Sequence, residues 1–173
     1  NGSGKHNNWS IGTDTGENLL DPGDTPNENL QFLLVLSCIM KAVDVHADLL
    51  RQSASCVGNE HRLGGQEAPP AIISICLGEQ LESVVDQIVS NADSIQLLAS
   101  GKLDSGVSTV PVLNRDATDR NRTTPFAFTG NKFEFRMPGS AENLSDCNTI
   151  LNTAVAKELK GYADELEKAD DFT

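Results

Sequence analysis

Apolar residues recur at helical spacing between Asn29 and about Gln52 of this chain. They are Phe32, Leu33, Leu36, Ile39, Met40, Val43, Ala47 and Leu50. This spacing predicts one long, largely buried helix. A second amphipathic stretch, Leu144–Lys168, predicts another helix with an apolar stripe. We expect both stripes to face partners outside this segment, which would favour self-association.

Three further segments have the pattern of short strands. Phe126–Phe128 and Phe133–Arg136 flank a turn at Thr129–Lys132, and Ala71–Leu77 is a short apolar run with several isoleucines. A helix is predicted over Glu79–Asn91, and loose alternation near the start of the chain predicts one more strand. The order β-α-β-α-β-β-α predicts an α+β fold with antiparallel strands backed by long helices.

Acidic residues outnumber basic ones, 25 to 13, so the net charge of the chain is −12. Nucleic acids and anionic membrane surfaces attract clustered Lys and Arg, and the composition therefore argues against both as partners. No apolar run approaches the roughly 18 residues of a transmembrane helix. The four cysteines form no C-x-x-C pair, which predicts reduced cytoplasmic thiols rather than a zinc site or a disulfide framework.

Glu134 and Arg136 lie two residues apart in a predicted strand, so both side chains should project from the same face. Phe133 and Phe135 alternate with them and would fix the opposite face. A carboxylate beside a guanidinium can hold a metal and an anion. The alternative is a surface ion pair. The aromatic backing and the arginines of the segment 115–122 favour a binding site.

His6 follows the glycine-rich segment Asn1–Gly4, where a ligand can approach the backbone closely. Imidazole together with a carboxylate suits manganese or magnesium, and a structural histidine is the alternative. The segment Thr118–Thr124, which contains Arg122, offers donors that can neutralise a transferred phosphoryl group, or it is a solvated loop. Neither a P-loop nor a G-x-G-x-x-G motif is present, so a nucleotide would need another architecture.

Four motifs of the chain resemble motifs of glutamine synthetase and follow one another in the same order as in that family. They are Asn1–His6 (N-G-S-G-x-H), Arg62–Pro69 (R-L-x-G-x-E-A-P), Asn121–Arg122 (N-R) and Lys132–Arg136 (R-x-E-x-R). Residues 119–136 are similar to the type III class in particular. The resemblance implies that residues 1–173 are a partial catalytic domain, without the amino-terminal domain, the upstream metal-ligand strands and the carboxyl-terminal region.

The resemblance implies ATP-dependent ligation of ammonia to glutamate through a γ-glutamyl phosphate. Its implied site residues are Asn1, Gly2, Arg62 and Arg136 for glutamate; Ser10, Arg122 and Lys132 for ATP; His6 and Glu134 for Mg²⁺ or Mn²⁺; and Glu67 and Arg122 for catalysis. Glu67, on a flap with Gly64 and Gly65 as hinges, would shield the acyl phosphate and help to take a proton from ammonium.

The resemblance also implies a cytoplasmic, ring-shaped homo-oligomer, a dodecamer, and the segment alone is expected to be inactive. The chain departs from bacterial type I enzymes, with Asn8 in place of a second histidine, Ala127 near a missing arginine and Lys132 in place of an arginine. Because the flap is one residue shorter than in type I, either Arg62 or His61 can be its substrate-binding position. Two alternatives stay open: a γ-glutamyl-amine ligase of the same family, and a non-catalytic assembly or sensing module.

Overall fold

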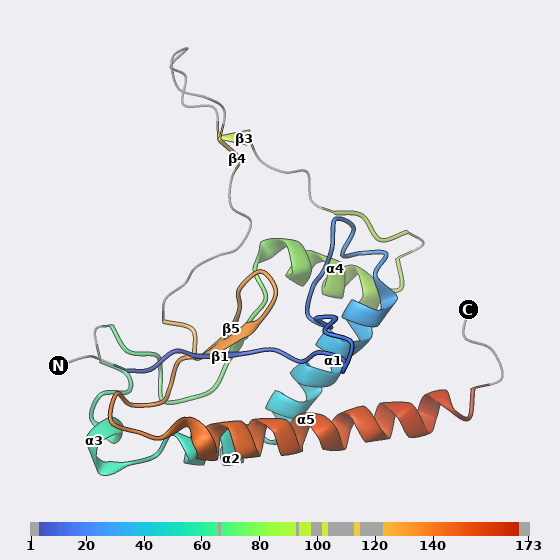
Figure 1. Cartoon of the computed structure of the whole chain (residues 1–173). Coiled ribbons are helices and arrows are strands. Elements are labelled where there is room, and N and C mark those ends of the chain that lie inside the picture. Colours follow the sequence, from blue (N-terminus) through green and yellow to red (C-terminus); the bar gives the residue numbers. More distant parts are fainter. Residues whose placement is uncertain are drawn as a thin grey trace.

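Within the part of the chain that the structure describes, five helices and a four-stranded sheet form an α+β fold (Figure 1). The computed structural model describes residues 4–65, 67–92, 94–97, 102–103, 113–114 and 123–169. The helices are α1 (Leu30–Val45), α2 (Ala47–Ser53), α3 (Val57–Glu60), α4 (Glu79–Val89) and α5 (Leu144–Leu166). The strands are β1 (Asn7–Trp9), β2 (Ile75–Cys76), β3 (Lys102–Leu103), β4 (Leu113–Asn114), β5 (Phe126–Phe128) and β6 (Phe133–Phe135). The predicted fold class is confirmed.

The four-stranded sheet has the order β1-β6-β5-β2 and joins strands from both ends of the chain. β6 runs antiparallel to β1 on one side and to β5 on the other. β2 pairs with β5 in parallel, so the sheet is mixed and not wholly antiparallel as predicted. A parallel pair needs a long crossover connection, which α4 and the chain up to β5 supply. β3 and β4 form a separate antiparallel pair.

The helix predicted over Asn29–Gln52 is two helices in the structure. Asn29 caps α1, since its Oδ1 accepts a hydrogen bond from the Phe32 backbone N–H at 3.0 Å. α1 ends directly before His46, whose φ of −114° and ψ of 25° interrupt the helix before α2 begins. Apolar spacing continues across this break, and periodicity alone therefore predicts a single helix.

α1 and α5 pack against each other and bury their apolar stripes in one core (Figure 1). Ile39 and Val43 of α1, like Leu151 and Val155 of α5, are at most 1 % exposed. The expectation that these stripes face partners outside the segment is therefore wrong, because the two helices cover each other. No helix in the described ranges is both long and apolar enough to cross a membrane.

A charged network ties α1 to α5 beside this core. Lys41 Nζ lies 3.1 Å from Glu158 Oε2, and His46 Nε2 lies 3.7 Å from Glu158 Oε1. The hydrogen bond from Lys41 holds the pKa of Glu158 below its usual value, against the opposing effect of burial. The ionised carboxylate therefore favours the folded state.

We predict that Glu158→Gln loosens the contact between α1 and α5 at neutral pH. Because the folded-state pKa of Glu158 is lowered, its contribution is present above the unfolded-state pKa and is lost as the pH falls through the lowered value. Amide hydrogen exchange in α1 and α5 should be faster in the variant at neutral pH and should match the unchanged protein in strong acid.

The control for this measurement is Asp164→Asn, which removes an exposed pair with Lys160 on the same helix. Exposed pairs contribute little to stability, so exchange in α1 and α5 should not change. A Glu158→Gln effect of equal size at every pH would contradict the electrostatic explanation.

Candidate functional site

One face of the sheet carries the polar side chains at the centre of the predicted site. Asn8 of β1, Glu134 of β6 and Ala127 of β5 are direct cross-strand partners, and directly paired residues share a face. The cross-strand neighbours of Glu134 are therefore Asn8 and Ala127, the two positions at which the resemblance implies a departure from type I enzymes. His6 and Arg136 lie beside Glu134 as well, because both contact its carboxylate.

Aromatic rings fill the opposite face of the sheet. Phe126 stacks on Phe133 with ring centroids 4.7 Å apart, and Phe128 meets Phe133 edge-on at 5.2 Å. Phe133 and Phe135 are fully buried, as the alternation in the sequence predicts. This packing fixes β6 in the core and thereby fixes the face from which Glu134 projects.

The carboxylate of Glu134 joins the two predicted partners. Its Oε2 accepts a hydrogen bond from Arg136 Nε at 3.0 Å and lies 3.4 Å from His6 Nδ1. The Arg136 side chain is 4 % exposed, that of Glu134 19 % and that of His6 54 %. Arg136 is therefore held inside the protein, and the contact is not the surface ion pair that the sequence left open. Only the imidazole side of this cluster is widely open to solvent.

Arg62 lies against the chain directly after β6. Its Nη1 donates to Met137 O at 2.9 Å and to Asn59 Oδ1 at 2.8 Å, and its Nη2 donates to Arg136 O at 3.3 Å. Burial lowers the pKa of Arg62, while the nearby Glu142 carboxylate raises it. His61 is exposed at the end of α3. Of the two alternatives for the flap position, the structure thus places Arg62 beside the predicted site.

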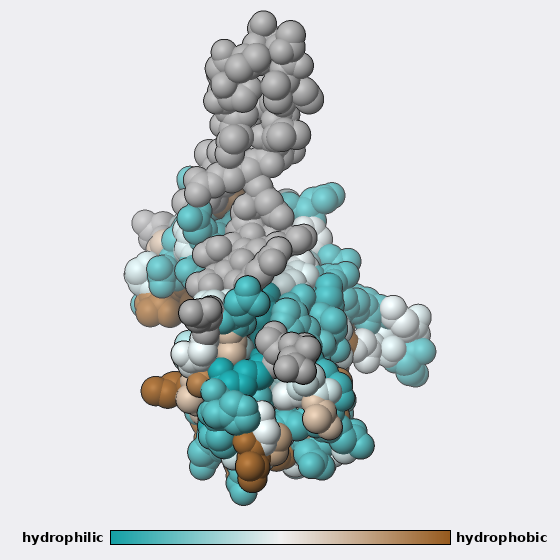
Figure 2. Space-filling model, turned by 90° about the vertical axis from the view of Figure 1, so that its left-hand side faces the viewer, coloured by the Kyte–Doolittle hydropathy of each residue, from teal (hydrophilic) through white to brown (hydrophobic). Residues whose placement is uncertain are grey.

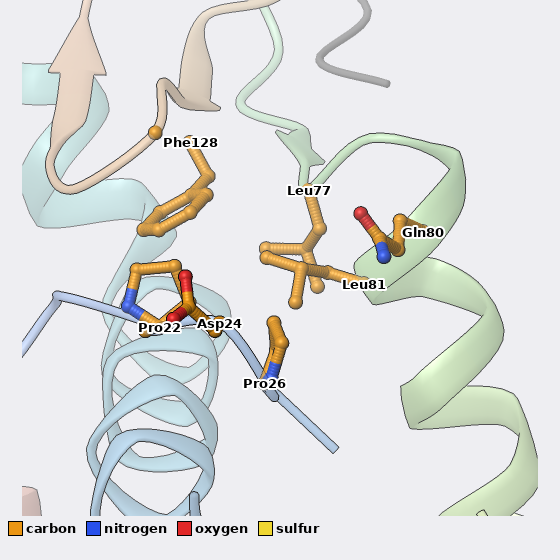
Figure 3. A pocket seen from close by; sticks show the side chains of 9 residues that line it. Pro22, Asp24, Pro26, Leu77, Gln80, Leu81 and Phe128 are labelled. Carbon is orange, nitrogen blue, oxygen red and sulfur yellow. The ribbon is translucent and has the colours of Figure 1, made fainter. Parts of the chain in front are cut away.

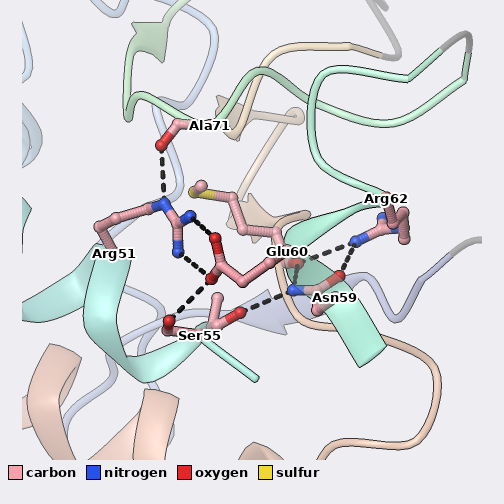
Figure 4. A network of polar contacts seen from close by, with 8 residues as sticks. Arg51, Ser55, Asn59, Glu60, Arg62 and Ala71 are labelled. Carbon is pink, nitrogen blue, oxygen red and sulfur yellow. Dashed lines mark hydrogen bonds and ion pairs between the residues drawn. The ribbon is translucent and has the colours of Figure 1, made fainter. Parts of the chain in front are cut away.

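The base of the flap is held by Arg51 of α2 (Figure 4). Its guanidinium makes two hydrogen bonds with Glu60, at 2.7 and 3.1 Å, and its Nε donates to Ala71 O at 2.7 Å. Glu60 precedes the flap and Ala71 follows it, so one side chain holds both ends. Glu67 is exposed between these ends, and a Gly64 φ of +82° supplies the left-handed turn that glycine favours.

Ser10 and Lys132 lie near the turn between β5 and β6. Ser10 Oγ donates to Asn18 Oδ1 at 2.5 Å, and Asn18 Nδ2 donates to Asn131 O at 2.9 Å. Lys132 is half-buried and directly precedes β6, two residues before Glu134. These residues therefore lie toward one end of β6 and Arg136 toward the other.

The described residues do not include three predicted site residues, Asn1, Gly2 and Arg122. Their predicted roles therefore stay predictions. Among the side chains that are described, no group of three or more His, Cys, Asp and Glu gathers as a metal site would. His6 and Glu134 offer one imidazole nitrogen and one carboxylate, donors that suit manganese or magnesium. A metal ion bound by these two side chains would need further ligands.

A pocket of about 350 Å³ lies elsewhere, between the loop 22–26, the start of α4 and the β5–β6 turn (Figure 3). Its labelled lining consists of Pro22, Pro26, Leu77, Leu81 and Phe128 with the polar Asp24 and Gln80. Phe128 belongs to the aromatic face of the sheet, so this pocket is not the cluster around Glu134. None of the predicted site residues lines it.

No family model matches the chain. It is 57 % identical to the type-3 glutamine synthetase of Dictyostelium discoideum over 96 % of this chain and 22 % of that protein. It is 47 % identical to the glutamine synthetase of Bacteroides fragilis over 97 % of this chain and 23 % of that protein. The enzyme of that name in Butyrivibrio fibrisolvens is 54 % identical over 78 % of this chain and 19 % of its own length.

The chain is homologous to part of glutamine synthetase. It spans about a fifth of the length of the curated relatives that it matches. The type III resemblance of its motifs agrees with the name of the Dictyostelium relative. In the described part of the chain, His6, Glu134, Arg136 and Arg62 lie side by side.

Asn59 contacts the predicted site residue Arg62, and none of the sequence motifs indicates this contact. Asn59 is fully buried and lies between Arg62 and the chain after β6. The signal available in the sequence is its position three residues before Arg62, which places the two side chains near each other on a helical turn. Nothing in that spacing reveals the contact with Met137, which is 78 residues away in the chain.

We predict that Gly4→Ala destabilises the protein, because a Cβ at this position would lie 2.0 Å from Arg62 Nη2 and 2.5 Å from its Cζ. Either the Arg62 guanidinium or the segment before β1 must move, and overpacking of this kind costs about 1–3 kcal/mol. Thermal denaturation of the full-length protein should show a lower midpoint.

The matched control is Gly161→Ala in α5, where no atom lies within 4 Å of the added Cβ. Alanine is favoured over glycine in a helix by about 1 kcal/mol, so this midpoint should be unchanged or higher. Equal midpoints for Gly4→Ala and the unchanged protein would mean that the segment before β1 does not press on Arg62.

Proposed function

We propose that this segment belongs to an ATP-dependent glutamate–ammonia ligase and carries part of its active site. The observation that carries the proposal is the meeting of Arg136 and His6 at one carboxylate oxygen of Glu134, at 3.0 and 3.4 Å. Glutamate, ammonium and ATP are the proposed substrates, and γ-glutamyl phosphate is the proposed intermediate. The names of the homologous proteins support the same activity.

β6 gives the proposed site a direction. Glu134 is the middle residue of β6, Lys132 directly precedes the strand and Arg136 directly follows it. We assign the Lys132 end to ATP and the Arg136 end to glutamate. The proposed ATP contacts are Ser10, Arg122 and Lys132, and the proposed glutamate contacts are Asn1, Gly2, Arg62 and Arg136. The phosphoryl group would then be transferred beside Glu134.

His6 and Glu134 would hold a divalent metal ion, Mg²⁺ or Mn²⁺, between these two ends. Once bound, the ion supplies positive charge that offsets the phosphate oxygens. Neutral imidazole and ionised carboxylate are the forms that ligate. Arg136 orients the Glu134 carboxylate from inside the protein through its 3.0 Å hydrogen bond, while the exposed His6 ring can turn toward the ion.

Glu67 and Arg122 are the proposed catalytic groups. Arg122 would offset the charge that develops on the transferred phosphoryl group. Glu67 stands exposed on the flap, and closure of the flap would exclude water and bring this carboxylate to bound ammonium. Loss of a proton to Glu67 would convert ammonium into ammonia, which would attack the carbonyl carbon of γ-glutamyl phosphate and release inorganic phosphate.

We extend the proposal to a cytoplasmic, ring-shaped homo-oligomer, a dodecamer, in which residues 1–173 are a partial catalytic domain without activity of their own. Two apolar side chains are widely exposed in this segment: Val57 of α3 is 93 % exposed and Ile72 is 80 % exposed. Their exposure supports the proposal that other parts of the full-length protein cover these side chains. The coloured part of the face that lies on the left in Figure 1 is mostly hydrophilic, with apolar side chains standing out singly or in small patches (Figure 2).

We predict that Glu134→Ala in the full-length protein lowers the rate of glutamine formation by about a hundredfold or more. Glu134→Gln keeps the shape and an oxygen for Arg136 but offers a far weaker metal ligand, so it should be almost as inactive. Asp164→Asn on α5 serves as the control with normal turnover. Near-normal rates for both Glu134 variants at saturating magnesium would reduce Glu134 to an ion-pair partner of Arg136.

We predict that Glu67→Gln lowers the rate of glutamine formation much more than the affinity for ATP. Ammonium and the acyl phosphate exist at the site only after the nucleotide has bound, and the carboxylate acts on them. The measurement is kcat beside the ATP dissociation constant. A parallel loss of both would assign Glu67 to the nucleotide site. Preference of the unchanged enzyme for a polyamine over ammonia would favour the γ-glutamyl-amine ligase instead.

A further inference from the structure

We propose that Asn59 is a positioning residue, which orients the Arg62 guanidinium so that one of its edges is reserved for a substrate carboxylate. The inference rests on the proposed function, in which Arg62 holds glutamate. Asn59 lies outside all four motifs that resemble glutamine synthetase. Its role is inferred from burial and hydrogen bonding alone.

The side-chain amide of Asn59 is fully buried and hydrogen-bonded in three directions (Figure 4). Its Nδ2 donates to Ala54 O at 2.6 Å and to Met137 O at 2.9 Å. Its Oδ1 accepts from Arg62 Nη1 at 2.8 Å. A flipped amide would turn its oxygen toward two carbonyls and its NH₂ toward the guanidinium, so only this orientation satisfies all the groups.

Main-chain carbonyls take up two more N–H groups of Arg62. Nη1 also donates to Met137 O at 2.9 Å, and Nη2 donates to Arg136 O at 3.3 Å. A guanidinium has five N–H donors in one plane, so these contacts leave Nε–H and one N–H of Nη2. Nε and Nη2 lie on the same edge of the plane, and such an edge binds a carboxylate through two parallel hydrogen bonds.

The remaining edge of Arg62 is short of an acceptor. Nε is buried and has no hydrogen-bond partner among the described residues. A buried donor without an acceptor is unfavourable, and a carboxylate at this edge would relieve that cost. The surroundings also disfavour the bare charge, since burial lowers the pKa of Arg62 against the opposing effect of Glu142. Both observations favour an anionic ligand here.

Close packing limits the ways in which this arrangement can relax. A Cβ on Gly139 would lie 3.2 Å from Asn59 Oδ1, and a Cβ on Gly4 would lie 2.0 Å from Arg62 Nη2. The amide and the guanidinium are thus enclosed by segments that come from opposite ends of the chain. Without the Asn59 oxygen, Nη1 would lose one acceptor. The guanidinium could then rotate, and its Nε–Nη2 edge could form hydrogen bonds with another acceptor within the protein.

A purely structural role for Asn59 predicts a different outcome. If the amide served only to anchor the chain after β6, its loss would lower stability and affect all substrates alike. A positioning role acts through Arg62, so its loss should affect glutamate selectively and should depend on the presence of Arg62. The two roles are separated by kinetics.

The test is a double-mutant cycle in the full-length protein, with the KM values for glutamate and ATP measured from glutamine formation. Asn59→Ala should raise the KM for glutamate about tenfold or more and leave the KM for ATP within about twofold. In an Arg62→Ala background the same substitution should raise the KM for glutamate no further. Independent, additive effects of the two substitutions would overturn the proposal.

A second variant, Asn59→Asp, covers the case in which Asn59→Ala does not fold. It keeps the size of the side chain and the oxygen that faces Arg62, but its negative charge offsets the guanidinium. The KM for glutamate should therefore rise in this variant too, and an unchanged value would overturn the proposal.

Asn148→Ala is the matched control. It removes a 2.8 Å hydrogen bond from Asn7 in a part of the protein that does not contact Arg62, and both KM values should stay unchanged. The outcomes also separate the two proposals. An unchanged protein that makes no glutamine would refute the proposed function, whereas normal activity with no effect of Arg62→Ala on the KM for glutamate would refute the positioning role alone.

Discussion

The burial of two phenylalanine rings on β6 is the interaction on which the candidate site depends. Phe133 and Phe135 are fully buried, and each such ring contributes about 1.5–3 kcal/mol when it leaves water. A slip of one residue in the pairing of β6 would expose both rings and turn Glu134 into the core. The direction of the Glu134 carboxylate therefore follows from hydrophobic packing. The polar contacts with His6 and Arg136 refine a position that the core has already set.

Periodicity in the sequence predicts those elements whose apolar residues all face the same core. α4, α5 and the strands β5 and β6 lie close to their predicted positions. The break at His46 is not predictable in this way, because the apolar spacing is the same on both sides of it. The parallel pairing of β2 with β5 is not predictable either, since it depends on the path of the chain between the two strands and not on the residues within them.

The candidate site divides along a similar line. Glu134 and Arg136 could be assigned to one face because strand alternation is a local property, and their contact at 3.0 Å follows from it. The burial of Arg136 and the contacts of Arg62 with main-chain carbonyls depend on segments that meet only in the folded protein. Asn59 shows what the sequence alone does not predict. A buried asparagine follows no sequence pattern, and its hydrogen bonds depend on acceptors and donors in segments that are distant in the chain.

The contacts around the flap hold its two ends and leave the tip with Glu67 exposed. Arg51 holds Glu60 and Ala71 at the two ends of the flap, and Gly64 N donates to Pro69 O at 2.9 Å across its neck. If the flap closes as proposed, these contacts would confine the movement to the tip that carries Glu67. Arg62 lies outside this tip, and its hydrogen bonds to Asn59 and to the chain after β6 would hold it during the proposed closure. In the proposed reaction, glutamate can then bind before the flap closes, and closure adds the ammonium-binding carboxylate without disturbing the guanidinium that holds the substrate.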